Sequence, residues 1–127
     1  MEPNLQVDEL ARRTIGAAIE VHRHLGPGYL ETVYEEALAV ELTERRIPFS
    51  RQPEITIEYK GRKIGQGRLD PLIDDQRIVG LKAVDQLMAI HKAQVISYLR
   101  ATGMPLGLPI NFNVEVFKRG LKRVVLT

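Results

Sequence analysis

The sequence predicts an α/β domain of α+β sandwich-like type, in which helices flank a mixed central sheet in the order ααβββαββ. Apolar residues recur at helical spacing through the first third of the chain, and a period-two alternation begins near residue 55. The chain has 127 residues, of which 44% are hydrophobic and 27% charged, as is usual for a soluble globular protein. We therefore expect residues 1–127 to form a single domain.

Three helices are expected. The first spans about residues 7–25 and ends at the Gly-Pro-Gly sequence 26–28, because glycine suits the left-handed position after a helix and proline cannot continue one. The second spans about residues 29–45. The third spans about residues 90–102 and stops at Gly103.

The strands are expected to build a mixed sheet of about four or five members, with the third helix packed against it. A half-buried strand at 55–60 is followed by a turn and by a return strand that contains two glycines, which suggest a bulge. The return strand and its successor are expected to form an antiparallel hairpin. The later expected strands are 63–73, 77–84, 106–112 and 121–126.

Composition narrows the classes of function. The chain has no cysteine, which excludes disulfides, a thiolate metal site and a cysteine nucleophile. No window approaches the ~18 consecutive apolar residues of a membrane span, and the first residues do not resemble a signal peptide, so we expect a cytoplasmic protein without a membrane partner. The net charge of +2 and the pI near 9.0 are weak indications of a polyanionic partner. A nucleic acid would need a local basic patch.

Polar residues gather around the second expected hairpin. Side chains of a strand alternate between faces, so Gly80 and Lys82 share one face. If residues 74–76 form a three-residue turn, Asp70 pairs across from Gly80 on that face, close to Lys82. An acid and an amine are then neighbours on an otherwise apolar hairpin.

Two helices could add polar groups to that hairpin. On the third helix, His91, Gln94 and Tyr98 follow one another at i, i+3 and i+7 and line one face. On the second helix, Glu31 and Tyr34 lie one turn apart on one side.

The residues at the start of the second expected helix resemble the signature of a known family. Gly28, Glu31 and Tyr34 are spaced G-x-x-E-x-x-Y, which resembles the signature of the bacterial and archaeal GxxExxY family. That family looks like a branch of the PD-(D/E)XK nuclease superfamily nearest the RecB-like group, and residues 94–98 fit the Q-x-x-x-Y motif of RecB-like nucleases. The resemblance continues through residues 20–28, 67–70, 78–83, 90–94, 97–99 and 110–113.

The resemblance implies a restriction-endonuclease-like core and metal-dependent hydrolysis of phosphodiester bonds in DNA or RNA. Glu31 and Asp70 would be carboxylate ligands for Mg²⁺ or Mn²⁺, hard cations that take oxygen ligands. Lys82 would orient the attacking water or stabilise charge on the phosphate. Gln94 and Tyr98 would position that lysine, the substrate or the metal-bound water.

The chain departs from the family pattern at one position. The pattern reads Ile-Val-Glu-Leu-Lys where residues 78–82 read Ile-Val-Gly-Leu-Lys, so Gly80 replaces the acidic member of the (D/E)XK pair. Glycine offers no side-chain oxygen, and inside a strand it weakens the sheet. The sequence leaves three explanations open: a natural loss, an engineered knock-out, or a site rescued by Glu31 and the Leu81 carbonyl.

Structural explanations compete with these functional ones. Asp70 can close a hairpin, Glu31 can complement its helix dipole, and Gln94 with Tyr98 can form a surface pair. His22 and Tyr34 follow helix-core spacing and are expected to be satisfied within the core. A non-catalytic nucleic-acid-binding module and a protein-interaction scaffold are therefore alternatives to a nuclease. The oligomeric state is left open, a homodimer included.

Overall fold

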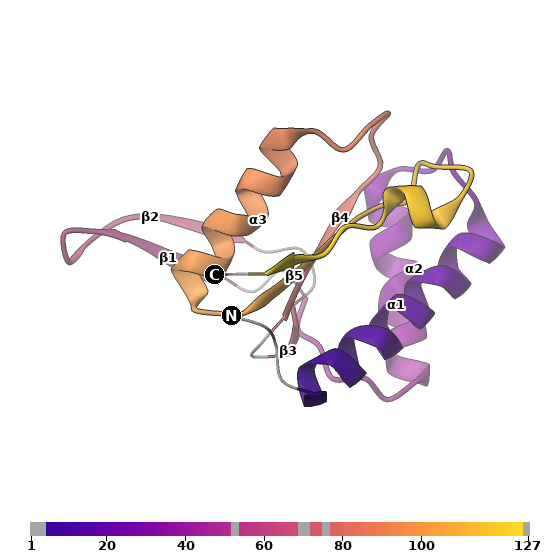
Figure 1. Cartoon of the computed structure of the whole chain (residues 1–127), viewed down its shortest axis with the longest axis horizontal. Helices are drawn as coiled ribbons and strands as arrows, with labels where there is room; N and C mark the ends of the chain where they lie inside the picture. The colour runs from indigo at the N-terminus through magenta and orange to yellow at the C-terminus, as the bar shows by residue number, and fades with distance from the viewer. Residues whose placement is uncertain (1–4, 52–53, 69–71, 75–76, 126–127) are drawn as a thin grey trace.

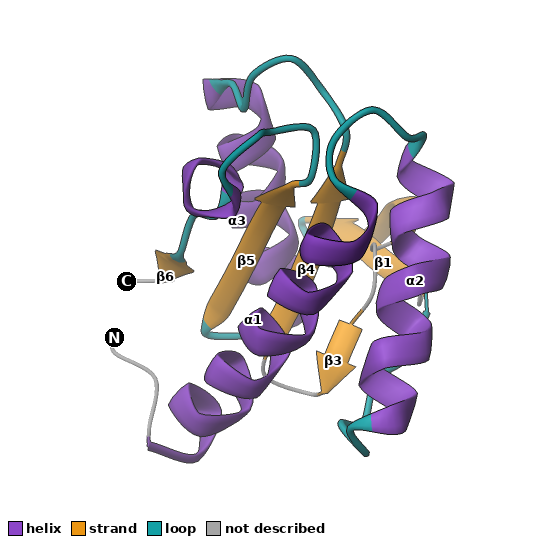
Figure 2. Cartoon of the chain, turned by 90° about the vertical axis from the view of Figure 1, so that its right-hand side faces the viewer, coloured by secondary structure: helices purple, strands orange, loops and turns teal. Residues whose placement is uncertain are grey.

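Three layers make up the fold, with α1 and α2 on one face of a four-stranded sheet and α3 on the other (Figures 1 and 2). The computed structural model describes residues 5–51, 54–68, 72–74, 77–125. The helices are α1 (Leu5–Leu25), α2 (Glu31–Glu44), α3 (Ala89–Thr102) and the short 3₁₀ helix η1 (Phe117–Gly120). The strands are β1 (Glu54–Tyr59), β2 (Arg62–Arg68), β3 (Leu72–Asp74), β4 (Arg77–Lys82), β5 (Leu106–Asn111) and β6 (Val124–Val125).

The predicted α/β class and the mixed sheet are confirmed. The sheet order is β3-β4-β5-β6, in which β4 and β5 are parallel and the other two pairs antiparallel. The helices begin and end within two residues of the predicted bounds, and Gly26 follows α1 with a φ of 66° as expected of a helix-ending glycine. None of the helices within the described ranges is long and apolar enough to cross a membrane.

The predicted return strand at 63–73 is instead divided between two sheets. Its first part, β2, pairs with β1 in a separate hairpin, and its last part, β3, pairs with β4. Residues 69–71 between these strands lie outside the described residues. A period-two pattern shows that a segment is extended but does not show which neighbour it pairs with, so the division could not be read from the sequence. The 3₁₀ helix η1 was missed because one turn has no periodic signal.

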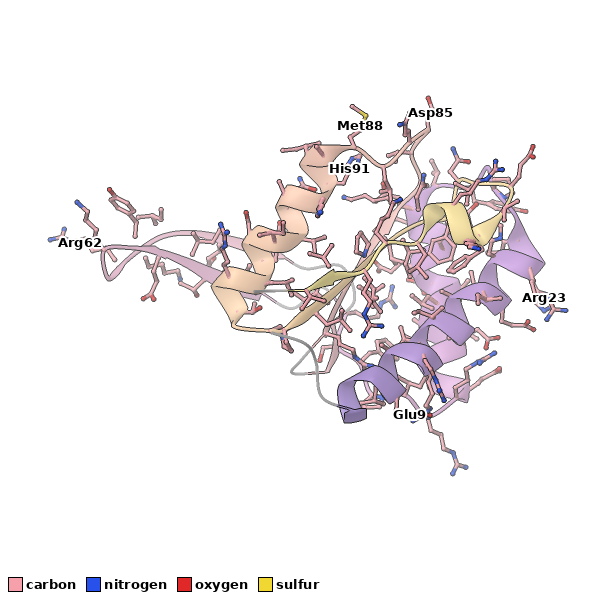
Figure 3. The ribbon with its side chains drawn as sticks, viewed as in Figure 1. Glu9, Arg23, Arg62, Asp85, Met88 and His91 are labelled. Carbon is pink, nitrogen blue, oxygen red and sulfur yellow. The ribbon has the colours of Figure 1, made fainter. Side chains whose placement is uncertain are left out.

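The β1–β2 hairpin corrects another prediction. Figure 1 shows it extending away from the layers, and Arg62 marks its far end in Figure 3. Only Ile55 of the expected half-buried stripe packs against the core, while Ile57 and Tyr59 are 38% and 60% exposed. The alternation of apolar and polar residues predicted the strand correctly, but it could not show that no layer among the described residues covers the apolar face. The bulge predicted from the glycines is present, opposite Ile57 and Glu58.

Burial on the two faces of β4 follows strand alternation. Val79 and Leu81 join the core cluster under α1 and α2, whereas Ile78 packs with Val95 and Leu99 of α3. Strand β5 lies between β4 and β6 and is buried throughout. The face of β4 that carries Gly80 and Lys82 is therefore the face covered by α3.

The distance between α3 and the sheet is set at Gly107 of β5. A Cβ atom at Gly107 would lie 2.3 Å from Cγ1 of Val95, far closer than carbon atoms approach one another. Gly107 is thus required by the close packing of α3. Gly80, in the neighbouring strand, is different: a Cβ there would lie 3.7 Å from Cγ2 of Val95 and 3.8 Å from Cα of Pro109, which is ordinary van der Waals contact.

The ends of β4 and β5 are joined by one buried amide. Asn111, 1% exposed, accepts a hydrogen bond from Val84 N–H at 3.1 Å and donates one to the Val84 carbonyl at 2.8 Å. Its Oδ1 also accepts from Asn113 N–H at 3.1 Å. Oδ1 of Asn113 in turn accepts from Gly28 N–H at 3.0 Å. The chain leaving β4, the end of β5 and the loop before α2 therefore share one network.

The chain that enters β1 is tied to α2 by Arg51. Its guanidinium donates to Glu35 at 2.7 Å and also to Glu36. The carboxylates of Glu36 and Glu35 raise the pKa of the Arg51 guanidinium above its ordinary value. Because Arg51 is largely open to solvent, this cluster orients the segment more than it stabilises the fold.

The two sheet glycines give a matched pair of substitutions. Gly107→Ala should lower the free energy of unfolding by about 1–3 kcal/mol, because the added methyl overlaps Val95. Gly80→Ala should leave it unchanged or raise it by about 0.5–1 kcal/mol, since the methyl finds room and the unfolded chain loses freedom. Urea unfolding of both variants measures the difference, and equal destabilisation would contradict the described packing of α3.

The buried amide gives a second comparison. Asn111→Ala should destabilise the protein by about 1–3 kcal/mol, because the buried amide is removed and the half-buried backbone groups of Val84 lose their partners. Asn113→Ala should cost about 1 kcal/mol, since Asn113 is half-buried and its contacts are closer to solvent. Thermal and urea unfolding measure both, and an Asn111→Ala variant as stable as the parent would show that the network does not hold the strands.

Candidate active site

A small hollow lies between β4 and α3, with a volume of about 30 Å³. That volume suits one or two water molecules rather than an organic ligand. It is lined by Ile78, Gly80, Lys82, His91, Gln94, Val95, Tyr98 and Pro109. Five of the positions singled out in the sequence therefore come together in one place: Gly80, Lys82, His91, Gln94 and Tyr98.

Secondary structure explains this gathering. Gly80 and Lys82 are two residues apart in β4 and face α3 together. Gln94, which is exposed, and the half-buried Tyr98 are one helical turn apart on α3 and both line the hollow. Because α3 packs closely at Gly107, its polar groups are brought down onto β4.

Glu31 approaches the end of β4 from the opposite layer. It is the first residue of α2, and its Oε2 accepts a long hydrogen bond of 3.4 Å from Ala83 N–H, one residue beyond Lys82. Glu31 is exposed and does not line the hollow. The structure thus places this carboxylate at the rim of the sheet, in contact with the residue that follows Lys82 but outside the group around Gly80.

The predicted site residue Asp70 lies outside the described residues. The neighbouring register is partly known, because Leu72 pairs with Ile78 in the antiparallel β3–β4 pair. The Leu72–Ile78 pair has the register expected from a three-residue turn at 74–76, but Asp74 itself belongs to β3 and pairs with Arg77 through a shift of register. A bulge of this kind adds a residue to the ladder next to a turn, and alternation alone does not reveal it.

The loop before α2 is held by Tyr34. Its hydroxyl donates to the Gly26 carbonyl at 2.6 Å and accepts from Tyr29 N–H at 3.2 Å. The Tyr34 ring stacks on Phe112 with centroids 4.8 Å apart. The prediction that Tyr34 is a packing residue with a local hydrogen-bond partner is confirmed. Tyr34 therefore fixes the loop that precedes α2, the helix that begins at Glu31.

Two histidines have structural partners. Nε2 of the buried His22 lies 2.6 Å from the Val114 carbonyl, which confirms the expected core role. Nδ1 of His91 accepts a hydrogen bond from Met88 N–H at 2.9 Å and so caps the start of α3. Figure 3 shows His91 and Met88 at this end of α3, well away from the hairpin tip at Arg62.

Sequence reasoning missed Val95 and Pro109, which complete the hollow. Val95 reads as an ordinary core residue of a helix. Pro109 sits in β5 directly beside Gly80, although a proline within a strand normally argues against a central position. The only available signal was the long apolar context of residues 106–112.

The described residues do not by themselves fit a divalent metal. They contain no group of three or more histidine, cysteine, aspartate or glutamate side chains that could hold an ion. Mg²⁺ takes oxygen ligands in near-octahedral geometry, usually including one or two carboxylates. Gly80 offers no side-chain oxygen to the hollow, and the Glu31 carboxylate lies outside it.

Comparison with known proteins gives one finding. A family model of the PD-(D/E)XK nuclease superfamily matches residues 8–124, which include both helical layers, the sheet and the hollow. Proteins of this superfamily typically use a divalent metal. Neither the curated proteins nor the solved structures yielded a match. The chain belongs to the PD-(D/E)XK nuclease superfamily.

Proposed function

We propose that this chain is a nuclease-like protein that binds DNA or RNA beside β4 and α3, and that its metal-dependent hydrolysis of phosphodiester bonds is lost or strongly reduced because Gly80 replaces an acidic ligand. The observation that carries the proposal is the hollow in which Lys82, Gln94 and Tyr98 surround Gly80. Because the chain belongs to a superfamily of nucleases, we place the reaction at this hollow.

The proposed roles follow from the chemistry of the side chains. Lys82, half-buried between strand and helix, stabilises negative charge on the phosphate. Gln94 and Tyr98 hold the lysine and a water molecule in position. Asp70 and Glu31 are the proposed carboxylates, and Asp70 meets the hollow if the Leu72–Ile78 register continues by two residues. A bound Mg²⁺ or Mn²⁺ would supply water activation and charge neutralisation.

The packing around Gly80 supports a lost ligand rather than a structural adaptation. Gly107 must be glycine because α3 leaves no space for a side chain, whereas Gly80 has ordinary contact distances. A strand residue that does not need to be glycine costs stability if it is one. Position 80 therefore has room for a Cβ atom, next to the hollow of about 30 Å³.

Within the superfamily, we place the chain in the GxxExxY, RecB-like branch. Three residues of that pattern act on one region of the structure: Gly28 binds Asn113, Tyr34 holds the loop, and Glu31 contacts the end of β4. This common location gives the motif a physical purpose, which is to set the α2 N-terminus against the strand that carries Lys82.

A non-catalytic nucleic-acid-binding module is the second candidate. It is favoured by the same absence of a carboxylate at position 80, because such a module keeps the polar hollow without needing a metal. A protein-interaction scaffold on this fold is a third alternative, in which the polar group has no ligand. The metal-binding and carboxylate-restoration experiments below separate the nuclease from both alternatives.

The first experiment measures metal affinity. The parent chain should bind Mg²⁺ only weakly, because too few anionic oxygens are present for a cation that gives up its waters reluctantly. Calorimetry is expected to show no tight site. Tight binding that is unaltered by Asp70→Ala would contradict the proposed site.

The second experiment restores the carboxylate. Gly80→Glu should create or increase metal-dependent cleavage of DNA or RNA by at least about tenfold over the parent, whereas the isosteric neutral control Gly80→Gln should not. Adding Lys82→Ala should abolish the gain, because the lysine and the metal act as one unit. The measurement is a nuclease assay with Mg²⁺ and with Mn²⁺ on purified variants.

The same series of variants includes a control for folding. A new buried carboxylate can destabilise the sheet when no cation compensates it, so the Tm of each variant is followed with and without Mn²⁺. If the Gly80→Glu variant is well folded but gains neither metal-dependent stability nor cleavage, the nuclease proposal is wrong.

A further inference from the structure

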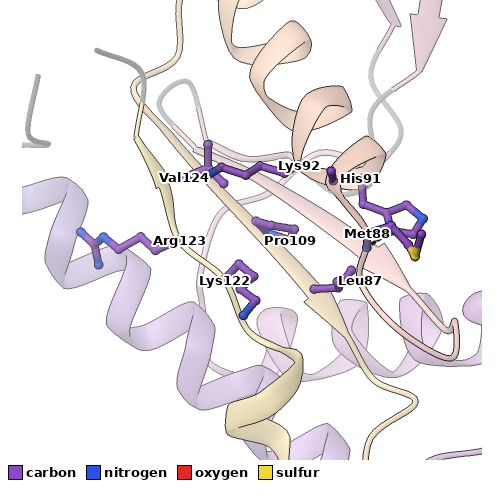
Figure 4. A pocket seen from close by; sticks show the side chains of 9 residues that line it. Leu87, Met88, His91, Lys92, Pro109, Lys122, Arg123 and Val124 are labelled. Atoms are coloured by element: carbon purple, nitrogen blue, oxygen red, sulfur yellow. Dashed lines mark hydrogen bonds between the residues drawn. The ribbon is translucent and has the colours of Figure 1, made fainter.

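A second and larger pocket adjoins the hollow at the start of α3 (Figure 4). Its volume is about 340 Å³, so it is more than ten times as large as the hollow. His91 and Pro109 line both spaces, and Pro109 forms the wall beside Gly80. A ligand in the larger pocket would therefore lie next to a group that reacts at the hollow.

The larger pocket is basic. Lys92 of α3 and Lys122, which precedes β6, line it together with Arg123, and none of the described residues that line it carries a carboxylate. Both lysines are exposed, and neither forms an ion pair with another described residue. In Figure 4 Lys92 extends across the pocket toward Val124, whereas Arg123 points away toward α1. The two lysines are thus the cations available to an anion here.

Apart from His91, the remainder of the lining is apolar. It consists of Leu87, Met88, Ala89, Pro109 and Val124, and Met88 is 58% exposed. An inorganic anion alone would gain nothing from these side chains. A volume of about 340 Å³ with apolar walls and lysines suits a ligand that has both an apolar part and a negative charge.

The wall of the pocket is held in place by neighbouring hydrogen bonds. Met88 N–H donates to Nδ1 of His91, which fixes the loop that carries Leu87 and Met88 at the start of α3. On the other side, Lys122 N–H donates to the Pro109 carbonyl at 3.1 Å and so fixes the lysine backbone on β5. The two lysines are therefore presented from anchored segments.

We propose that this pocket binds one nucleotide of the nucleic-acid strand, next to the phosphodiester bond held at the hollow. The phosphate is bound by Lys92 and Lys122, and the sugar or base packs against Leu87, Met88 and Val124. The proposal rests on the proposed function and deepens it by assigning a subsite for the flanking nucleotide. It also explains how a chain with a net charge of only +2 can hold a polyanion, since the positive charge is local.

The pocket is tested first without any cleavage. A nucleoside 5′-monophosphate is titrated into the isotopically labelled parent chain, and the unphosphorylated nucleoside is the companion probe. Amide NMR signals of residues 87–92 and 122–124 should shift with the monophosphate and shift far less with the nucleoside. The Lys92→Ala/Lys122→Ala variant should lose the response, and the absence of shifts at these residues in the parent would overturn the proposal.

Binding of a short single-stranded oligonucleotide is tested next by fluorescence anisotropy over a range of salt. Lys92→Ala/Lys122→Ala should weaken binding by about tenfold and reduce the slope of log K against log salt by about 0.7–1.4, as one or two phosphate contacts are lost. The control is Lys118→Ala/Arg119→Ala, which removes the same charge from exposed positions on η1, and it should have little effect. If both variants weaken oligonucleotide binding equally, binding depends on the overall positive charge and not on this pocket, and the subsite is overturned.

The two proposals fail in different ways. If Gly80→Glu cleaves nucleic acid but the pocket signals do not respond, the subsite is wrong and the nuclease site stands. If the pocket signals respond to the monophosphate and no variant cleaves, the subsite stands and the chain is a nucleic-acid-binding module.

Discussion

The architecture of this site depends on the buried amide of Asn111. It bonds both the N–H and the carbonyl of Val84, two residues past Lys82, and so fixes where β4 ends. Through Asn113 the same network reaches Gly28 and the loop that begins α2 at Glu31. Since a buried backbone group without a partner is costly, these segments are locked in one arrangement. The positions of the lysine and of the rim carboxylate therefore have a common origin.

A second constraint sets the depth of the site. Gly107 lets Val95 approach β5 without a side chain between them, and α3 consequently lies close to the sheet. The hollow is narrow for this reason, and its polar groups from β4 and α3 are near one another. Close packing also brings Val95 and Leu99 of α3 into one apolar cluster with Ile78 of β4. The helix–sheet contact thus supplies stability and the geometry of the site together.

Strong local patterns could be predicted from the sequence. The helical periodicity gave the three helices, and strand alternation placed Gly80 and Lys82 together under the face where Gln94 and Tyr98 lie. The Gly-Pro-Gly loop and the core roles of His22 and Tyr34 were also anticipated, because local helix spacing places both side chains on the apolar face, although their partners Val114 and Phe112 are distant in the sequence.

Features that depend on tertiary contacts could not be predicted. The exposure of Ile57 and Tyr59 is decided by the absence of a covering layer in the described part of the fold. Arg77 is fully buried although its residue type favours the surface. The basic pocket combines Lys92 and Lys122, which are distant in sequence and meet only because β6 lies beside β5 near the start of α3.

The central claim is that the site around Lys82 is intact except for one carboxylate. Its most direct test is a crystal structure of the Gly80→Glu variant grown with Mn²⁺, with the ion located by anomalous scattering. We expect a Mn²⁺ peak at the introduced carboxylate, between β4 and α3 and close to the Lys82 side chain. A well-ordered variant in which the carboxylate turns out of the hollow, with no Mn²⁺ beside it, would contradict the claim.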